Sequence, residues 1–290
     1  MKQVFFVLLL LISTAASAQT APAQTNGTEY LTPFPPHHVI ANIYFVGSKG
    51  QADYLITTPE GHILINAGVE DNVPMIQQSV EKLGFKFSEV KILLLSHAHF
   101  DHDAGAMKIK QLTGAKYFVM DADVPVVESG GKKDFFYGDK PGMLYPAAKV
   151  DRVLHDGDVV RLGNTELTAH LTPGHTKGCT TWTMKVKDGD KILDVVIIGS
   201  PNVNPGYKLV NNTAYPQIAA DYEKTFRVLH SLPCDVFLGA HGDYYDMGTK
   251  YPRLKDGGKN PFIDPEGYKA YVADREQAFR TELAKQGGGK

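Results

Sequence analysis

Cysteine and surplus charge are two things this sequence has little of. Only 2 of its 290 residues are cysteine, too few for a disulfide framework or a four-thiolate zinc site. Its 30 Lys and Arg stand against 32 Asp and Glu, for a formal net charge of −2. Because no basic excess is available to neutralise a phosphate backbone, we expect no nucleic-acid partner. Any bound metal must be held by imidazole and carboxylate groups, and the chain contains 11 His.

Long apolar runs are also scarce. One run, over residues 4–12, follows Lys2 and leads into small residues that end at Ala18. This order is typical of a secretory signal peptide over residues 1–18, cleaved after Ala18, and it predicts export to the periplasm. The alternative is a membrane anchor, although the run is too short to span a bilayer comfortably. No later stretch approaches about 18 apolar residues, so we expect no membrane span in the mature chain.

The mature chain, residues 19–290, is expected to form a single domain whose ends, over 19–30 and 287–290, are disordered. Apolar residues at helical spacing predict helices over 73–83, 104–112, 218–232 and 265–285. Strands are predicted over 42–46, 52–58, 62–66, 90–95, 116–120, 159–162, 165–171, 180–186, 192–198 and 236–238. Residues 121–140 are expected to be a long mobile loop. The order favours an α/β fold with a two-sheet core and helices outside it.

Four potential metal ligands lie within six residues, where a predicted buried strand leads into a predicted helix. They are His97, His99, Asp101 and His102. Four such polar side chains in six residues could not easily all find hydrogen-bond partners if their role were only structural, so we interpret the segment as a metal site. One metal cannot easily accept four side chains from so short a piece, whereas two adjacent metals can.

Two further histidines, His175 and His241, follow predicted strands closely, and loops at strand ends are where sites are usually built. Either one alone could be a hydrogen-bonded surface residue. Together with the cluster they complete two sets of three ligands: His97, His99 and His175 for one metal, and Asp101, His102 and His241 for the other. Three protein ligands leave open positions, as in catalytic zinc sites.

Two zinc ions at such a site would lower the pKa of bound water to about 7 and attract an anionic substrate. The expected chemistry is metal-assisted hydrolysis of an acyl or phosphoryl bond, with a zinc-bound hydroxide as the nucleophile. Asp101 would both ligate the second metal and orient the nucleophile.

The HxHxDH motif at residues 97–102, with His175 and His241 downstream in order, resembles the metallo-β-lactamase superfamily. The resemblance covers essentially the whole mature chain and implies a four-layer αββα sandwich. HxHxDH does not specify a substrate, because relatives include thioester hydrolases, lactonases, phosphodiesterases and nucleases.

Three features favour the third subclass of class B β-lactamases. Ser200 stands where glyoxalase II and most relatives place a metal-bridging Asp. Cys179 and Cys234 lie away from the position of the zinc-binding Cys of the first and second subclasses. Both predicted metal sites are complete without a thiolate, as in the third subclass. The two cysteines should lie at opposite ends of a sheet, beyond the roughly 7 Å limit for a disulfide, so we expect both to be unpaired.

This resemblance implies an exported dizinc enzyme that opens the β-lactam amide of penicillins, cephalosporins and carbapenems. By position, Ser200 and Asn204 are candidates for contacting the β-lactam carboxylate, and Tyr207 is a candidate for stabilising the oxyanion. All three could instead be ordinary turn residues. The aromatic residues 135–137 could cover a substrate.

Two other functions remain open at this point: a lactonase or thioesterase on the same fold, and a zinc-binding protein without catalysis. The open coordination positions argue against the second of these. No stretch is typical of a coiled coil, so we expect a monomer.

Overall fold

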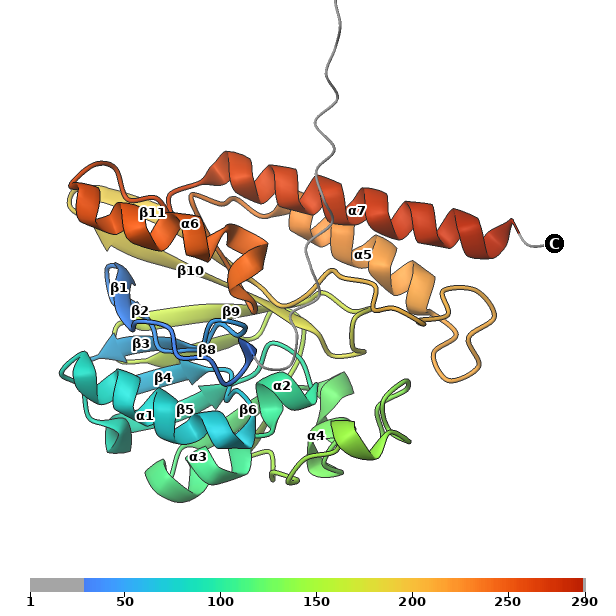
Figure 1. Ribbon diagram of the computed structural model, residues 1–290, viewed down its shortest axis with the longest axis horizontal. Helices are drawn as coiled ribbons and strands as arrows, with labels where there is room; N and C mark the ends of the chain where they lie inside the picture. Colours follow the sequence, from blue (N-terminus) through green and yellow to red (C-terminus); the bar gives the residue numbers. More distant parts are fainter. Residues whose placement is uncertain (1–28, 289–290) are drawn as a thin grey trace, which may run out of the picture.

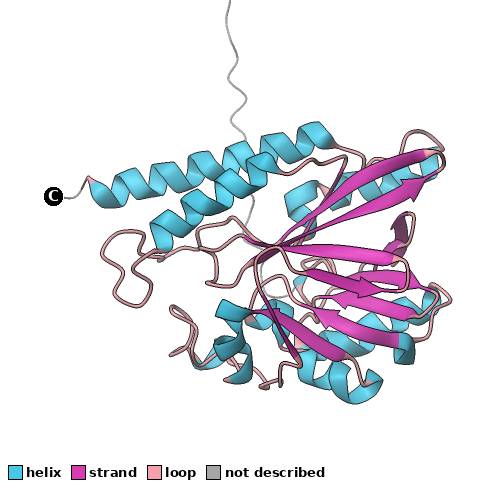
Figure 2. Ribbon diagram, turned by 180° about the vertical axis from the view of Figure 1, so that it is seen from behind, coloured by secondary structure: helices cyan, strands magenta, loops and turns pink. Residues whose placement is uncertain are grey.

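The computed structural model describes residues 29–288, which form two β-sheets packed face to face between outer layers of helices (Figure 1). Figure 2 shows the same layers from behind. The predicted αββα sandwich is therefore confirmed. The predicted signal peptide over 1–18, and most of the predicted disordered leader over 19–30, lie outside the described residues.

The first sheet has seven strands in the spatial order β1-β2-β3-β4-β5-β6-β7. They are β1 (His37–Ile40), β2 (Ile43–Phe45), β3 (Tyr54–Thr58), β4 (Gly61–Ile65), β5 (Val90–Leu94), β6 (Lys116–Met120) and β7 (Arg152–Leu154). Strands β4 to β7 pair in parallel, so their carboxyl ends meet at one edge of the sheet. The HxHxDH segment leaves β5 at that edge, which is where open α/β sheets usually place their sites.

The second sheet has five strands in the order β12-β11-β10-β9-β8. They are β8 (Val159–Leu162), β9 (Thr165–Leu171), β10 (Thr180–Asp188), β11 (Lys191–Ile198) and β12 (Val236–Gly239). Both β9 and β11 are antiparallel to β10, and β12 is parallel to β11. The segments after β9, β11 and β12 therefore emerge at one edge and bring distant parts of the chain together.

Helices cover the outer face of each sheet. In Figure 1, α1 (Val73–Lys82) and α3 (Ala106–Thr113) lie on the first sheet, and α5 (Ile218–Ser231) and α7 (Pro265–Gly287) lie on the second. Shorter helices are α2 (Phe100–Asp103), α4 (Val124–Glu128), α6 (Met247–Arg253), η2 (Glu70–Asn72), η3 (Phe87–Glu89), η4 (Asp121–Asp123), η5 (Pro141–Met143), η6 (Gly242–Tyr245) and η7 (Leu254–Asp256). No described helix is long and apolar enough to cross a membrane.

Strand β4 shows why the central strands are continuously apolar. Successive side chains of a strand point to opposite faces. Ile63 and Ile65 join the core that includes Trp182 of the second sheet, whereas Leu64 joins the core that includes Val73 and Ile76 of α1. Both faces of the strand are thus buried, and the alternation of polar and apolar residues seen in half-exposed strands is absent here.

Several boundaries differ from the sequence-based prediction. The helix expected over 104–112 begins at Ala106, and the amide of Gly105 just before it donates at 3.1 Å to the carbonyl oxygen of Gly68, outside the helix. The loop expected over 121–140 begins with η4 and α4. The edge strands β1 and β7 and the helix α6 were not predicted; at four and three residues the strands are too short to show a period.

Residues of both predicted disordered ends, among them Tyr30 and Gly287, lie within the described part of the chain. Tyr30, assigned to the disordered leader, packs edge-on against Phe100 with ring centroids 5.9 Å apart. At the other end α7 continues to Gly287.

Both cysteines are free, as predicted. Cys179 directly precedes β10, and Cys234 precedes β12. The register pairs Trp182 with Ile197 and Val195 with Val236, which puts the two cysteines at opposite ends of the sheet.

Candidate metal centre

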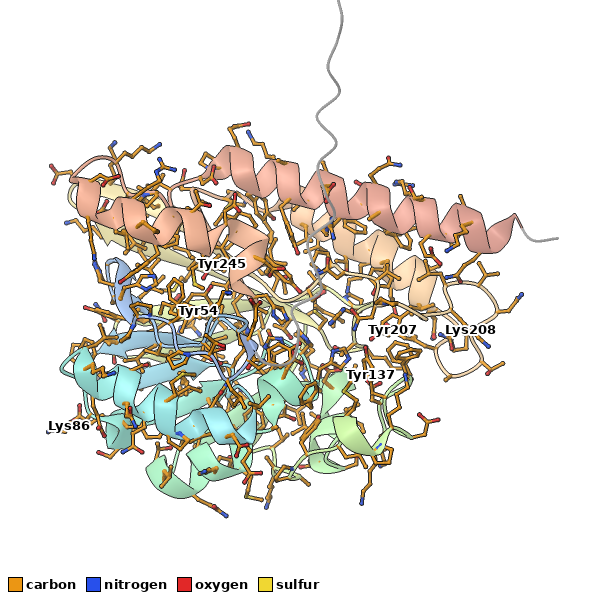
Figure 3. The ribbon with its side chains drawn as sticks, in the orientation of Figure 1. Tyr54, Lys86, Tyr137, Tyr207, Lys208 and Tyr245 are labelled. Atoms are coloured by element: carbon orange, nitrogen blue, oxygen red, sulfur yellow. The ribbon has the colours of Figure 1, made fainter. Side chains whose placement is uncertain are left out.

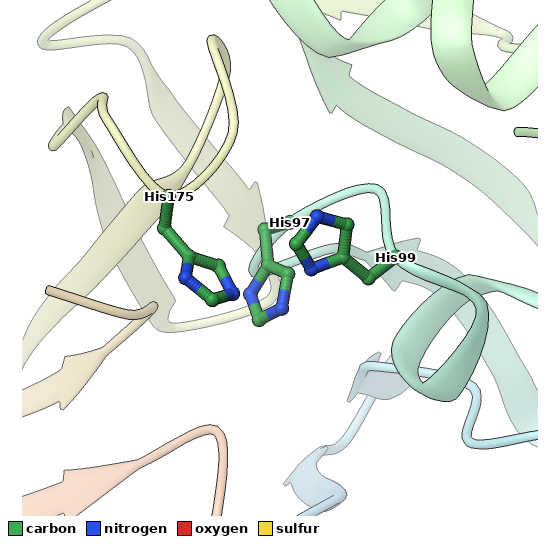
Figure 4. A group of neighbouring side chains, drawn as sticks. All are labelled: His97, His99 and His175. Atoms are coloured by element: carbon green, nitrogen blue, oxygen red, sulfur yellow. The ribbon is translucent and has the colours of Figure 1, made fainter. Parts of the chain in front are cut away.

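Three imidazoles converge where the two sheets meet. His97 and His99 come from the turn after β5, and His175 comes from the loop after β9 (Figure 4). Their ring centroids lie 4.5 to 4.9 Å apart, and one nitrogen of each ring lies within 4.8 Å of the others. All three are buried. This is the first of the two predicted ligand sets, brought together as expected.

The second set lies beside the first and includes His241 from the segment after β12. His102 Nε2 lies 3.0 Å from His241 Nε2, and Asp101 Oδ2 lies 3.3 Å and 3.6 Å from these two nitrogens. Ligands about 2.0–2.2 Å from a tetrahedral zinc are separated by roughly 3.3 Å from one another. The three atoms thus already have the spacing of three corners of a tetrahedral coordination shell.

Hydrogen bonds determine which ring nitrogen of His175 and of His241 is free to bind a metal. His175 Nδ1 donates to the carbonyl oxygen of Asn202 at 2.8 Å, and His241 Nδ1 donates to that of Gly50 at 2.8 Å. Both rings therefore turn an unprotonated Nε2 toward the centre. Support of this kind, from the nitrogen that does not bind metal, is usual for metal-ligating histidines.

In His99 the supporting contacts are at the other ring nitrogen, Nε2. Its Nε2 lies 3.4 Å from Tyr207 Oη and 3.8 Å from Asp134 Oδ2, which leaves Nδ1 for a metal. The Tyr207 hydroxyl itself donates to the carbonyl oxygen of His175 at 2.9 Å.

Burial keeps these imidazoles neutral. Desolvation is the main cause that lowers the pKa of His99 to about 4 and that of His175 to about 3, with neighbouring histidines adding to the effect. The same causes hold the pKa values of His97 and His102 well below the usual 6.5. Near neutral pH the site is a group of lone pairs crowded around a small space, a donor set suited to zinc.

Asp123 of η4 ties two ligand-bearing loops together. Its carboxylate accepts hydrogen bonds from Ala98 N at 3.0 Å, Thr176 Oγ1 at 2.7 Å and Gly178 N at 2.7 Å. Ala98 lies between two ligands of the first turn, and Thr176 follows His175. Burial raises the pKa of Asp123 to about 6, against which these three donors act.

Five of the six predicted ligands line one pocket of about 530 Å³, and the sixth, His102, is fully buried and not part of the lining. Aromatic and polar side chains make up most of its other walls: Tyr30, Asp134, Tyr137, Tyr145, Asn202, Asn204, Asp243, Tyr244 and Arg275. The ring of Tyr137 stands edge-on to His99, with centroids 5.1 Å apart. The centre can therefore hold metal ions at the floor of a cavity large enough for a small organic substrate.

Comparison with known proteins agrees with this geometry. The family model of the metallo-beta-lactamase superfamily matches residues 47–241, a span that includes all six predicted metal ligands. The chain belongs to the metallo-beta-lactamase superfamily.

Two solved structures of the superfamily are closely similar. FEZ-1 metallo-beta-lactamase from Legionella gormanii is 57% identical, with a TM-score of 0.88 over 89% of this chain and 98% of that one. BJP-1, a subclass B3 metallo-beta-lactamase of Bradyrhizobium japonicum, is 39% identical, with a TM-score of 0.84 over 90% of this chain and 98% of that one. The resemblance to the third subclass is thereby confirmed.

Curated relatives match less of the chain. A protein described as a probable metallo-hydrolase, from Burkholderia pseudomallei, is 30% identical over 105 residues. That match covers 36% of this chain and 35% of the relative, so the chain spans about a third of its length.

The remaining predicted residues of this metallo-beta-lactamase site have different placements. Asn204 lines the pocket and donates from Nδ2 to Tyr137 Oη at 3.0 Å. Ser200 is 1% exposed, does not line the pocket, and has its hydroxyl 3.0 Å from Tyr244 Oη. Tyr207 also lies outside the pocket lining; Figure 3 shows it near Tyr137. Contact of Ser200 and Tyr207 with substrate stays a prediction, and in this structure the two hydroxyls form hydrogen bonds with Tyr244 and with the carbonyl of His175.

Sequence reasoning missed several residues of this site, among them Asp123, Asn202, Tyr244 and Arg275. Asn202 and Tyr244 follow strand ends by a few residues, so proximity to Ser200 and His241 was a usable signal. Arg275 lies within the long helix α7, where its position relative to β11 is set by tertiary packing and leaves no local pattern.

Proposed function

We propose that this protein is an exported dizinc hydrolase that opens the β-lactam amide of penicillins, cephalosporins and carbapenems. Two zinc ions are the proposed cofactors, a small-molecule β-lactam is the proposed substrate, and the protein acts as a monomer in the periplasm. The predicted signal peptide over 1–18 supports export.

The convergence of Asp101, His102 and His241 carries the proposal. Their ligating atoms lie 3.0 to 3.6 Å apart beside the three-histidine set, and no thiolate lies among the described ligand candidates. The similarity to FEZ-1 and BJP-1, which are named as metallo-beta-lactamases, spans 98% of each of those chains. A sulfur-free pair of three-ligand sets thus supports a dizinc centre of the third subclass.

Each part of the chain has a separate task in this proposal. Bound zinc would supply a Lewis acid for the lactam carbonyl and a water of lowered pKa. Asp101 would hold the second metal and accept a hydrogen bond that orients the attacking group. Asn204, which lines the pocket, would donate to the substrate. Tyr207 and Ser200 would keep His175 and Tyr244 in place, through the hydrogen-bond distances given above.

Hydrolysis of a chromogenic cephalosporin tests the proposal. The zinc-loaded protein should turn over this substrate, and a chelator should stop the reaction until zinc is restored. Bound zinc, measured by atomic emission, should reach two ions per chain at full activity. An inert zinc-replete protein would reject the proposal.

A lactonase or thioesterase on the same fold is the competing function. Ser200, buried at the position where thioesterase relatives carry a bridging carboxylate, argues against it. A panel of lactone and thioester substrates assayed beside the cephalosporin decides between them, because faster turnover of either class would replace the β-lactamase assignment.

A further inference from the structure

Arg275 of α7 brings a guanidinium to the wall of the pocket that holds both ligand sets. Among the described residues that line this pocket it is the one Lys or Arg, whereas Asp101, Asp134 and Asp243 contribute three carboxylates. Its side chain is 15% exposed. A cation placed in this way gives the pocket a preferred position for an anionic group.

A single residue, Asn202, connects the guanidinium to the first ligand set. Arg275 Nη1 is 3.5 Å from Asn202 Oδ1, and the backbone carbonyl of Asn202 accepts the hydrogen bond from His175 Nδ1 at 2.8 Å. Arg275 is therefore anchored to the same loop residue that orients a metal ligand. A substrate group bound by Arg275 would therefore lie close to the scissile bond, if that bond is positioned beside His175.

The remaining contacts of Arg275 leave two of its N–H donors free to bind a ligand, although the guanidinium also lies over the ring of Tyr271, 5.9 Å from its centroid. Arg275 Nε donates at 3.0 Å to Asp274 Oδ2, and Nη2 contacts the same oxygen. The Asp274 side chain is 65% exposed, and exposed ion pairs contribute little stability because water competes with them. Of five N–H donors on a guanidinium, two have no partner among residues 29–288.

We propose that Arg275 binds the carboxylate of the β-lactam substrate and determines specificity for it. This inference rests on the proposed function. Penicillins, cephalosporins and carbapenems all carry a carboxylate on the carbon bonded to the lactam nitrogen, so the binding cation must lie in the same pocket as the metal ligands. Arg pairs with carboxylates through two parallel N–H donors, which fixes orientation as well as position. The buried Ser200, predicted from sequence for this contact, is not on the pocket wall.

The test pairs a change in the protein with a change in the substrate. The zinc-loaded enzyme and its Arg275→Ala variant are assayed with benzylpenicillin and with its methyl ester, which lacks the charge. Loss of a charged hydrogen bond should raise KM for the acid by about tenfold to a hundredfold with kcat within about twofold. For the ester, both constants should be equal in the two proteins. Arg275→Lys should recover part of the loss, because it keeps the charge without the planar fork.

Arg280→Ala is the matched control, since Arg280 lies on the same helix, is 59% exposed and pairs with Glu276 away from the pocket. It should leave KM for the acid unchanged. Zinc content and melting temperature are measured for every variant. Equal effects of Arg275→Ala on acid and ester would overturn the inference, because Arg275 would then act through Asn202. A wild-type enzyme that hydrolyses neither compound would instead reject the proposed function, and the inference with it.

Discussion

The hydroxyl of Tyr207 donates to the backbone carbonyl of His175 at 2.9 Å, while the same oxygen lies 3.4 Å from Nε2 of His99. One phenol thus contacts two members of the three-histidine set. It is 2% exposed, and the hydrophobic side chains around it include Phe135 and Phe136. This relationship assigns Tyr207 to the support of the metal ligands.

Tyr207→Phe should therefore weaken zinc binding at the first site. Removal of such a supporting hydrogen bond typically costs 10- to 100-fold in metal affinity. Competition with a chromophoric chelator measures the affinity, and activity at saturating zinc should fall much less. Normal zinc affinity combined with a large loss of kcat would instead indicate the oxyanion role suggested by sequence position.

Asp101→Ala should remove one of two bound zinc ions and most turnover while the protein stays folded. Asp101 supplies an oxygen to the second set, and only His102 and His241 would remain there. Zinc stoichiometry, turnover of a chromogenic cephalosporin and circular dichroism together check this outcome. His155→Ala is the control, because the His155 side chain is 68% exposed and does not line the pocket. Near-normal activity in Asp101→Ala would contradict the role given to Asp101.

Asp123→Ala should destabilise the fold and loosen both ligand loops. Three buried donors, Ala98 N, Thr176 Oγ1 and Gly178 N, would lose their acceptor. Unsatisfied buried donors cost about 1–3 kcal/mol each, so for three donors we expect a loss of at least about 3 kcal/mol in the free energy of unfolding. Denaturant unfolding measures it, with the exposed Asp121→Ala as the control two residues away. Equal stabilities of these two variants would contradict the role of Asp123.

Asp53→Asn should change how stability depends on pH. Burial raises the pKa of Asp53 from 3.8 to about 7, the charge of Asp101 adds to this, and the amide of Gly68 acts against it. The folded protein therefore holds a proton that the unfolded chain releases, so stability falls as pH rises from about 4 to about 7. The asparagine variant lacks this loss and should gain up to about 4 kcal/mol relative to wild type over that range.

Urea unfolding of the metal-free protein at a series of pH values measures this difference. Asp190→Asn, at the exposed turn between β10 and β11, provides the control. Parallel stability curves for wild type and Asp53→Asn would show that Asp53 has the same protonation in the folded and unfolded chains.

Local sequence patterns predicted most of the fold, because the central strands are continuous apolar runs and helices such as α1 and α5 have apolar residues at helical spacing. The limits of α1 and β5, for example, lie within one residue of the predicted ones. The metal ligands were also predictable, since four of them lie within one turn and two follow strand ends. The six side chains lie close together, whereas their division into two ligand sets and their occupation by zinc remain predictions.

Burial and long-range packing could not be predicted in the same way. Ser200 and Asn204 lie on one short segment, yet the first turns inward to Tyr244 and the second outward to the pocket. The choice depends on partners from distant parts of the chain: Tyr244 of η6, 44 residues from Ser200, and Tyr137 of the segment after α4, 67 residues from Asn204. Arg275 and Asp123 could not be predicted for the same reason, because the site residues that they contact lie on other parts of the chain.

Each ligand set combines side chains from both sheets. His97, His99, Asp101 and His102 follow β5 of the first sheet, whereas His175 and His241 follow β9 and β12 of the second. An ion bound to either set would be a cross-link between the two halves of the sandwich, in a chain whose two cysteines are free and offer no covalent one. Zinc binding would then be coupled to the docking of the sheets, so the metal supply would govern the lifetime of the folded protein as well as its chemistry.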